Sequence, residues 1–352
     1  MNLAFIGFGG MGEYHARSLQ KYAKSEPSCP IRMVGVYDIR EERMHVAEKY
    51  GMKAYPNADA LLKDPSVEAV LIATPNDVHA PYVKAAAAAG KNIVCEKPIA
   101  LNSREAEEMY DAAERAGVVF EVHQNRRWDD DFLTMKNIMD SRSVGDVYKI
   151  ESRVMGSNGI PGDWRKIRRQ GGGMMLDWGV HLIDQMLQAI PSRVESLYCE
   201  YSYIYGEEVE DGCDLSVLFE NGVRYRVVIS TDCFRNLPRW QIYGTEGTAT
   251  IADWDLSGGM TRALVKEGAQ VVGIQAGNGF TKTMAPREGD TVEQLPLPVV
   301  HAEPYAFYKN FASACAGKEK QAVHREEVLR VFRLMEAAER SARENIVIKE
   351  KL

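Results

Sequence analysis

No apolar run in the 352-residue sequence approaches the ~18 residues that a membrane-spanning helix needs. The first residues, MNLAFIGFGG, lack the basic segment of a secretory signal, and glycines interrupt their apolar run within a few positions. The six cysteines are scattered, with no CxxC pair and no dense cluster, which indicates reduced thiols rather than a disulfide framework. We therefore expect a cytoplasmic protein without a membrane partner.

The chain also has no excess of positive charge and no metal-binding motif. Its 43 lysine and arginine residues are fewer than its 50 aspartate and glutamate residues, and the formal net charge is -7. Because binding to nucleic acid requires a basic face, we expect no nucleic-acid partner. Neither HExxH nor CxxC occurs, so no metal site is expected. The length and the 45% hydrophobic content are those of an ordinary globular protein with two domains.

Residues 1–122 alternate short apolar strands with helical patterns. Strands are predicted in NLAFI, IRMVGVY, VEAVLIA, KNIVC and VVFEV, and each of the first four is followed by a segment with helical composition. Strands that alternate with helices of this length predict an α/β fold with a doubly wound parallel sheet, as in a Rossmann domain. We expect this dinucleotide-binding domain to end at a short connection near residues 122–130.

The first predicted strand is followed by a glycine turn. Gly7, Gly9 and Gly12 have the spacing G-x-G-x-x-G, with a strand before them and a helix after them, which is the context that a dinucleotide-binding turn requires. In such a turn the first glycine bends the chain, the second admits the pyrophosphate and the third lets helix and strand pack closely. The cofactor is therefore expected to contact Gly7, Phe8, Gly9, Gly10, Met11 and Gly12.

Asp38 ends the second predicted strand. In a Rossmann fold an acidic residue at this place binds the hydroxyls of the adenosine ribose. An aspartate disfavours a 2′-phosphate, so NAD is the expected cofactor. Arg40, two residues later, could instead bind that phosphate, and this leaves NADP open.

Polar residues follow the later strands of the first domain. Because ligands bind at the carboxyl ends of parallel strands, these residues are expected to converge on one crevice. His79 is expected to line its adenosine side, whereas His15 is expected on the surface of the first helix. The residues predicted to contact the cofactor along this edge are Thr74, Asn76, His79, Glu96, Lys97 and Asn125.

Residues 123–352 have a different sequence pattern, with alternating runs that are rich in aromatic and β-branched residues. Asn221–Gly222 predicts a hairpin between two of them. We expect a C-terminal α+β domain with a large, mainly antiparallel, open-faced sheet, one face of which is covered by helices at 173–189 and 303–316. A last helix is predicted at 326–345, followed by a short strand. The other face is expected to expose Tyr201, Tyr203 and Tyr205, a surface through which copies of the chain would form a homo-oligomer.

The segment GGGMMLDWGVHLIDQM predicts a helix with two distinct rows of side chains. Leu176, Val180, Ile183 and Leu187 form an apolar stripe, and Asp177, His181, Asp184 and Gln188 run beside it. Residues four apart on a helix are neighbours, so Asp177 and His181 are expected to meet. This polar row is predicted to be the working face of the helix.

Together, GFGGMG, ATPNDVH, CEKPIAL and GGGMMLDWGVHLID resemble the Gfo/Idh/MocA oxidoreductase family, in order and spacing, across the whole chain. The resemblance implies that Lys97, Asp177 and His181 meet at the nicotinamide and act on a secondary alcohol of a sugar or cyclitol. Within the family, HQNRRWDDDFLTMKNIM and NGIPGDWR are similar to the branch of scyllo-inositol dehydrogenases and glycoside 3-dehydrogenases.

The chemistry of these residues is consistent with that implication. A histidine, with an ordinary pKa near ~6.5, suits a base at neutral pH, and a lysine stabilises a developing alkoxide. Either His181 or Lys97 could take the proton, while Asp177 could orient the imidazole or bind a hydroxyl. The residues predicted to contact the substrate are Lys97, Arg126, Asn158, Trp164, Arg165, Asp177 and His181.

Three functions follow from the sequence. The first is NAD(P)-dependent oxidation of a secondary ring hydroxyl of a sugar, glycoside or cyclitol, with C3 of a glucoside and inositol as the leading substrates. The second is a redox-neutral enzyme that holds its NAD tightly. The third is a ligand sensor that has lost catalysis, although the intact Lys97, Asp177 and His181 speak against it.

Overall fold

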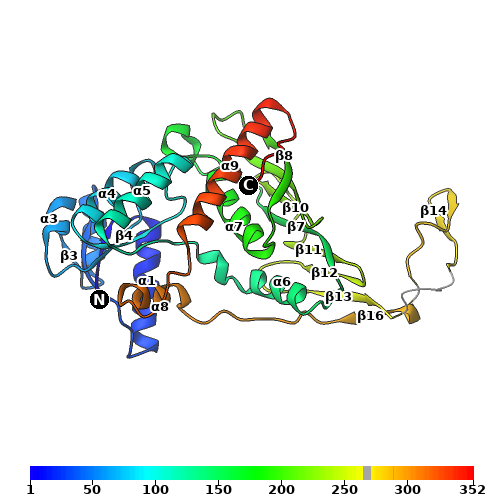
Figure 1. Ribbon diagram of the computed structural model, residues 1–352, viewed down its shortest axis with the longest axis horizontal. Coiled ribbons are helices and arrows are strands. Elements are labelled where there is room, and N and C mark those ends of the chain that lie inside the picture. The colour runs from blue at the N-terminus through cyan, green and yellow to red at the C-terminus, as the bar shows by residue number, and fades with distance from the viewer. Residues whose placement is uncertain (265–270, 288) are drawn as a thin grey trace.

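A computed structural model describes residues 1–264, 271–287 and 289–352. The chain builds two large sheets that lie next to each other, with helices between them (Figure 1). The first sheet has six strands in the order β3-β2-β1-β4-β5-β6, and all of its neighbouring strands are parallel. This confirms the predicted doubly wound α/β fold. The order reverses between β1 and β4, so a ligand crevice is expected at the carboxyl ends of these strands.

The elements of this first part follow the predicted alternation. They are β1 (Asn2–Ile6), α1 (Gly10–Ser25), β2 (Arg32–Tyr37), α2 (Glu41–Glu48), β3 (Lys53–Ala54), α3 (Ala58–Lys63), β4 (Ala69–Ile72), η1 (Asn76–Val78), α4 (His79–Ala88), β5 (Asn92–Cys95), α5 (Ser103–Ala116), β6 (Phe120–Val122) and η2 (Asn125–Trp128).

The second sheet has eight strands in the order β16-β13-β12-β11-β7-β10-β9-β8, antiparallel except for the β7–β10 pair. The predicted mainly antiparallel sheet is thus confirmed, as is the hairpin at Asn221–Gly222, which joins β9 to β10. Its elements, with the helices that accompany them, are α6 (Asp130–Asp140), β7 (Val147–Met155), η3 (Trp164–Lys166), η4 (Arg168–Gln170), the π-helix η5 (Met175–Gly179), α7 (Val180–Ala189), β8 (Val194–Ser202), β9 (Gly212–Phe219), β10 (Arg224–Ser230), β11 (Trp240–Gly244), β12 (Gly247–Ile251), β13 (Gly258–Ala263), η6 (Gly289–Thr291), β16 (Val292–Leu295), α8 (Ala306–Cys315) and α9 (Arg325–Glu344). Strands β14 (Ile274–Ala276) and β15 (Gly279–Thr281) pair with each other in a separate two-stranded sheet.

The sequence predicted that helix α8 would cover the second sheet, but the helix packs against the first sheet instead. Its Phe307 and Phe311 belong to the core that contains Leu3 and Phe5 of the first sheet, and Figure 1 shows α8 beside α1. The helix itself was predicted correctly, but the sequence pattern of a helix does not determine which of two sheets its apolar face packs against. Helix α9 contacts both parts, because Phe332 packs into a core of the first and Leu334 into the core of the second.

The open face of the second sheet also differs from the prediction. Strand β8 ends at Ser202, so Tyr203 and Tyr205 lie in the following loop, where Asp211 accepts the N–H of Tyr205. Tyr201 packs against the core. The outer face carries charged side chains instead, such as the ion pair between Arg226 and Asp214. The predicted row of three tyrosines on this face is therefore wrong, and self-association through this face stays a prediction.

The six cysteines are free thiols. The predicted strand after the last helix is reduced to a single bridge between Ile348 and Leu197. Among the described residues, no helix combines the length and the apolarity that crossing a bilayer requires.

Candidate active site

The glycine turn has the shape that its spacing predicts. Gly7 has a φ of +89°, and a Cβ there would lie 2.6 Å from the carbonyl oxygen of Ala73. A Cβ on Gly12 would lie 2.5 Å from the carbonyl oxygen of Gly7. Helix α1 begins at Gly10, and no side chain caps its first turn. The free N–H groups at this helix start suit a phosphate.

Two residues of this turn have side chains that face opposite ways. The ring of Phe8 is fully buried in the core, so only its backbone is available to a cofactor, whereas Met11 is exposed.

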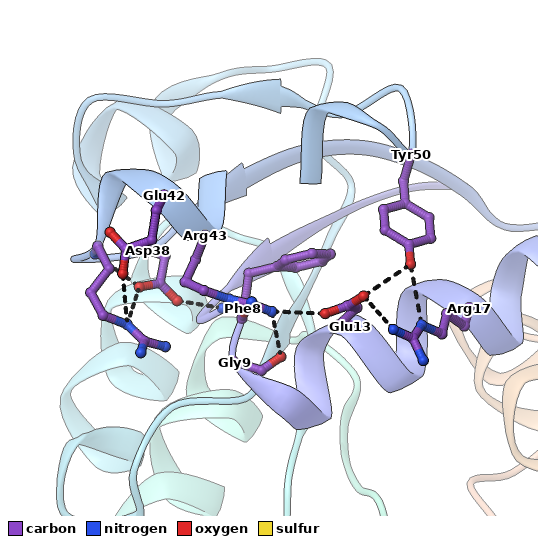
Figure 2. Close-up of polar contacts among 9 residues, drawn as sticks. Phe8, Gly9, Glu13, Arg17, Asp38, Glu42, Arg43 and Tyr50 are labelled. Atoms are coloured by element: carbon purple, nitrogen blue, oxygen red, sulfur yellow. Dashed lines mark hydrogen bonds and ion pairs between the residues drawn. The ribbon is translucent and has the colours of Figure 1, made fainter. Parts of the chain in front are cut away.

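Asp38 lies against the glycine turn, at the predicted ribose position. Its Oδ2 accepts the N–H of Phe8 at 2.6 Å, and its Oδ1 accepts the N–H of Arg40 at 2.9 Å (Figure 2). The guanidinium of Arg40 is 55% exposed, with its Nε 3.6 Å from Asp38 Oδ1. Arg43, which the sequence did not single out, donates to the carbonyl oxygen of Phe8 at 2.7 Å and pairs with Glu13. The turn is thus braced from β2 and α2, and the side chain of Arg40 remains exposed beside it.

The polar ends of the later strands converge as predicted. Asn76 is buried and donates to the carbonyl oxygen of Gly171 at 3.0 Å, which joins the end of β4 to the glycine run before α7. Thr74 Oγ1, Gln124 Oε1 and His181 Nδ1 are buried and have no hydrogen-bond partner in the described part of the chain. Buried polar atoms are rarely left unpaired, so these three fit a polar ligand such as a nicotinamide nucleotide. Asn125 begins η2 beside them and is half-buried.

His79 does not line the adenosine side of the crevice. The residue is fully buried, and its Nδ1 and Nε2 lie 3.0 Å and 2.9 Å from the carbonyl oxygens of Pro98 and Thr74. With both ring nitrogens on main-chain groups, it joins two loops of the site and has no free atom for a cofactor.

The side chain of Glu96 also points inward rather than toward a cofactor. Its Oε1 lies 2.7 Å from His15 Nε2 and 2.8 Å from His123 Nδ1, and its Oε2 accepts the N–H of Lys97. Burial would raise the pKa of Glu96, but the histidine donors outweigh it and hold this pKa well below its ordinary value. His15, predicted on the surface, is fully buried here, and its Nδ1 meets the hydroxyl of Tyr308 on α8.

The ligand atoms of His15, Glu96 and His123 lie within 4.8 Å of one another, a grouping that a metal ion could use. The hydrogen bonds just described already pair the facing atoms of all three residues.

Lys97 and Asp177 form the centre of the site. Lys97 Nζ donates to the carbonyl oxygen of Asp177 at 2.9 Å and to its Oδ1 at 3.2 Å. Arg165 Nε lies 3.5 Å from Asp177 Oδ2, so the predicted rim residue does reach the carboxylate at this centre. Trp164 lies under the guanidinium of Arg165, with a separation of 4.5 Å from its ring centroid. Asn158 is exposed, and no contact with Lys97, Asp177 or His181 is found for it in the described residues.

Asp177 and His181 do not form the predicted pair. Asp177 lies in the π-helical turn η5, whereas the prediction assumed an α-helix from 173 onward. A spacing of four suits 3.6 residues per turn, but the wider π turn shifts the two side chains out of line. The carboxylate turns to Lys97 and Arg165 instead. Single π turns inside helices are rare and frequent at functional sites.

Glu210, from the loop before β9, holds the start of this turn. Its Oε1 accepts the N–H of Met175 at 2.9 Å, and its carbonyl oxygen accepts the N–H of Met174. Gly173 has a φ of +106°, and a Cβ there would lie 2.4 Å from Glu210 Oε1. This close contact is a structural reason for a glycine at position 173.

His181 is 4% exposed. Burial, and then the positive charges of Lys97 and Arg126, hold the pKa of His181 well below its ordinary value. The imidazole is therefore neutral at neutral pH and able to accept a proton. Asp184, also in the predicted polar row, is buried and accepts two hydrogen bonds from the guanidinium of Arg127, so its role is structural.

Arg126 lies beside this histidine. Its Nη1 donates to Asp129 at 2.8 Å, whereas its Nε is buried without a hydrogen-bond partner in the described residues. Its Cζ is 4.4 Å from the ring centroid of Trp178, and that ring is 5.9 Å from the imidazole of His181. The predicted substrate residue thus lies against the ring that contacts His181.

Both parts of the chain match models of one protein family. Residues 1–124 match the oxidoreductase family with an NAD-binding Rossmann fold, and residues 132–250 match the GFO/IDH/MocA C-terminal domain. The crystal structure of an NAD-binding protein from Listeria innocua is similar, with a TM-score of 0.94 and 41% identity over 99% of both chains. An uncharacterized oxidoreductase of Schizosaccharomyces pombe is 31% identical, with 87% of this chain and 89% of the relative covered. A scyllo-inositol 2-dehydrogenase (NADP(+)) of Bacillus subtilis is 27% identical, with 82% of this chain and 81% of the relative covered.

Proposed function

Because the chain belongs to the Gfo/Idh/MocA family of NAD-binding oxidoreductases, we propose that it oxidises a secondary ring hydroxyl of a sugar, glycoside or cyclitol to a ketone. When bound, the nicotinamide accepts the hydride that leaves the carbon. The observation that carries the proposal is the meeting of a lysine–aspartate pair with a buried, neutral histidine at the crevice of the first sheet. This set of groups is suited to removing a hydroxyl proton while charge develops on oxygen.

The hydrogen bonds favour His181 as the base. Lys97 Nζ already donates to two oxygens of Asp177, so its hydrogen bonds are directed at the carboxylate and main chain of that residue. His181 has an unpaired ring nitrogen and is neutral, so it can accept the hydroxyl proton. Lys97 then stabilises the alkoxide, and this interaction is stronger in the transition state than with the alcohol.

Charge balance favours a neutral, polyhydroxylated substrate. Three cations of the candidate site are each paired with a carboxylate, namely Lys97 with Asp177, Arg126 with Asp129, and Arg165 with Asp163. Such pairs offer fixed donors and acceptors for hydroxyl groups without a net charge that would select an acid. We propose inositols and glucosides, with oxidation at C3, as the first substrates to test. The name of the Bacillus subtilis relative, a cyclitol dehydrogenase, supports the first of these.

The test is a substrate panel. Purified protein would be mixed with NAD or NADP and with myo-inositol, scyllo-inositol, glucose or aryl glucosides, while absorbance at the NADH wavelength is followed. Appearance of NADH with a cyclitol or glycoside is the expected result. Bound cofactor in equal amount to the protein, without NADH release, would point to the redox-neutral reaction. Cofactor binding without conversion of any substrate, judged by product analysis, would contradict catalysis and favour a sensor.

We further propose that NAD is preferred over NADP because of Asp38. Replacing Asp38 with asparagine removes the charge that repels a 2′-phosphate and keeps an oxygen for the N–H of Phe8. The exposed Arg40 would then bind the phosphate. The ratio of kcat/KM for NAD to that for NADP is expected to fall about tenfold or more. In the matched variant Arg40→Ala, use of NADP should decrease while use of NAD is kept. A wild-type protein that prefers NADP would contradict this assignment.

A further inference from the structure

Trp254 lies in the turn between β12 and β13, far in sequence from every predicted site residue. Its side chain is 43% exposed, yet its ring meets that of Trp178, with the centroids 6.2 Å apart and the planes at 43°. Arg126 Cζ lies 4.4 Å from the ring centroid of Trp178 and 5.0 Å from that of Trp254. The guanidinium therefore lies against two indole rings that also contact each other, at distances at which cation–π attraction is effective.

The inner side of Trp254 is anchored to the core of the second sheet. Arg239 Cζ lies 4.7 Å from the ring centroid of Trp254 and 4.4 Å from that of Trp240. Trp240 is fully buried, and its Nε1 donates to Asp131 at 2.7 Å. Alternating rings and guanidinium groups thus connect a rigid point of the sheet with Trp178, the neighbour of His181.

Arg126 needs this support. In the described part of the chain, Asp129 is the one hydrogen-bond partner of this side chain, through Nη1, and that contact fixes one edge of a long side chain. Without Trp254, the guanidinium would lose one of the two rings that it lies against, and the side chain could rotate away from His181.

We propose that Trp254 is a positioning residue for the reaction at His181, because it holds Arg126 against Trp178, the ring that contacts His181. This inference rests on the proposed function only for its kinetic consequences. The geometry itself can be tested without a substrate.

The groups that face His181 determine the sign of the expected effect. Lys97 and Glu96 lie at the end of β5, Arg126 lies in η2, and His123 follows β6. Burial and the two cations Lys97 and Arg126 lower the pKa of His181, whereas Glu96 raises it. If Arg126 moves away, one lowering cause is lost, and the pKa of His181 rises toward its ordinary value. The acidic limb of kcat/KM should then move to higher pH.

The test compares Trp254→Ala, Trp254→Phe and Tyr243→Ala. Tyr243 lies on β11 of the same sheet and stacks on Lys149 at 4.9 Å, so it is a matched cation–aromatic pair outside the site. Trp254→Ala is expected to lower kcat about tenfold with little change in KM and to shift the acidic limb upward. Trp254→Phe, which keeps a ring, should remain within about threefold of wild type, and Tyr243→Ala should leave both readouts unchanged.

Two further measurements keep the proposal falsifiable. In a variant that already carries Arg126→Gln, adding Trp254→Ala should have no further effect, because both changes remove the same contact. NMR titration of His181, assigned with a His181→Gln variant, should give a higher pKa in Trp254→Ala than in wild type, whether or not a substrate is known. Additive losses, or an unchanged His181 titration in a folded Trp254→Ala protein, would overturn the positioning role. An active wild type without these shifts would leave the proposed function intact.

Discussion

Substitution of alanine for Lys97 is expected to lower kcat about a hundred- to a thousandfold, the usual loss when a charge-stabilising donor is removed. The ammonium group is the cation that pairs with Asp177 at the centre of the site, and no other described lysine contacts that carboxylate. Its loss removes the charge that faces a developing alkoxide, and Asp177 is left to pair with Arg165 alone. Steady-state rates with the substrate identified by the panel would measure the effect.

The control for this experiment is Lys84→Ala. Lys84 forms an ion pair with Glu108 on the surface, with 2.8 Å between Nζ and Oε2, so its removal is the same chemical change outside the site. Its rate should equal that of wild type. Full turnover by Lys97→Ala would refute the assigned role of the lysine.

The second large effect is expected at His181. Replacement by glutamine, which keeps a polar side chain of similar length but cannot act as a base, should lower kcat about a hundred- to ten-thousandfold. Because burial and the charges of Lys97 and Arg126 hold the pKa of His181 well below its ordinary value, the imidazole stays neutral as the pH falls through ~6.5. Activity of the wild type should therefore persist through that pH and decline only at lower pH, as the base becomes protonated.

A pH profile of kcat/KM would check this sign. In His181→Gln the acidic limb should disappear from the residual activity. The exposed His45 serves as the control, since His45→Gln should change neither the rate nor the profile. An acidic limb of the wild type at or above pH ~6.5 would contradict a depressed pKa and would favour Lys97 or an ordinary histidine as the base.

The sequence predicted those features that depend on neighbouring residues. The glycine turn, the strand and helix alternation and the hairpin at Asn221–Gly222 each follow from residues within one short segment, and the structure has them in place. The approach of Lys97 to Asp177 was also expected, because the family resemblance links two motifs 80 residues apart.

Contacts between distant segments were not predictable in this way. Glu210 holds the turn of Asp177 through a bond to Met175, 35 residues away, and Tyr308 reaches His15 across 293 residues. Neither residue stands in a motif. The π turn was missed because a spacing of four fits an ordinary helix, and the polar face of the second sheet was missed because alternate tyrosines were assumed to continue a strand that ends at Ser202.

The return of the chain to the first sheet limits how this protein can be recombined with its relatives. A chimera with a single crossover near residue 124 would take its cofactor domain from a relative. The core of that domain would still be completed by Phe307, Tyr308 and Phe311 of α8 from this protein. Phe332 of α9, also from this protein, would pack against the opposite face of the transplanted sheet. A transplanted cofactor specificity therefore has to bring α8 and the first half of α9 with it, although they lie almost 200 residues farther along the chain.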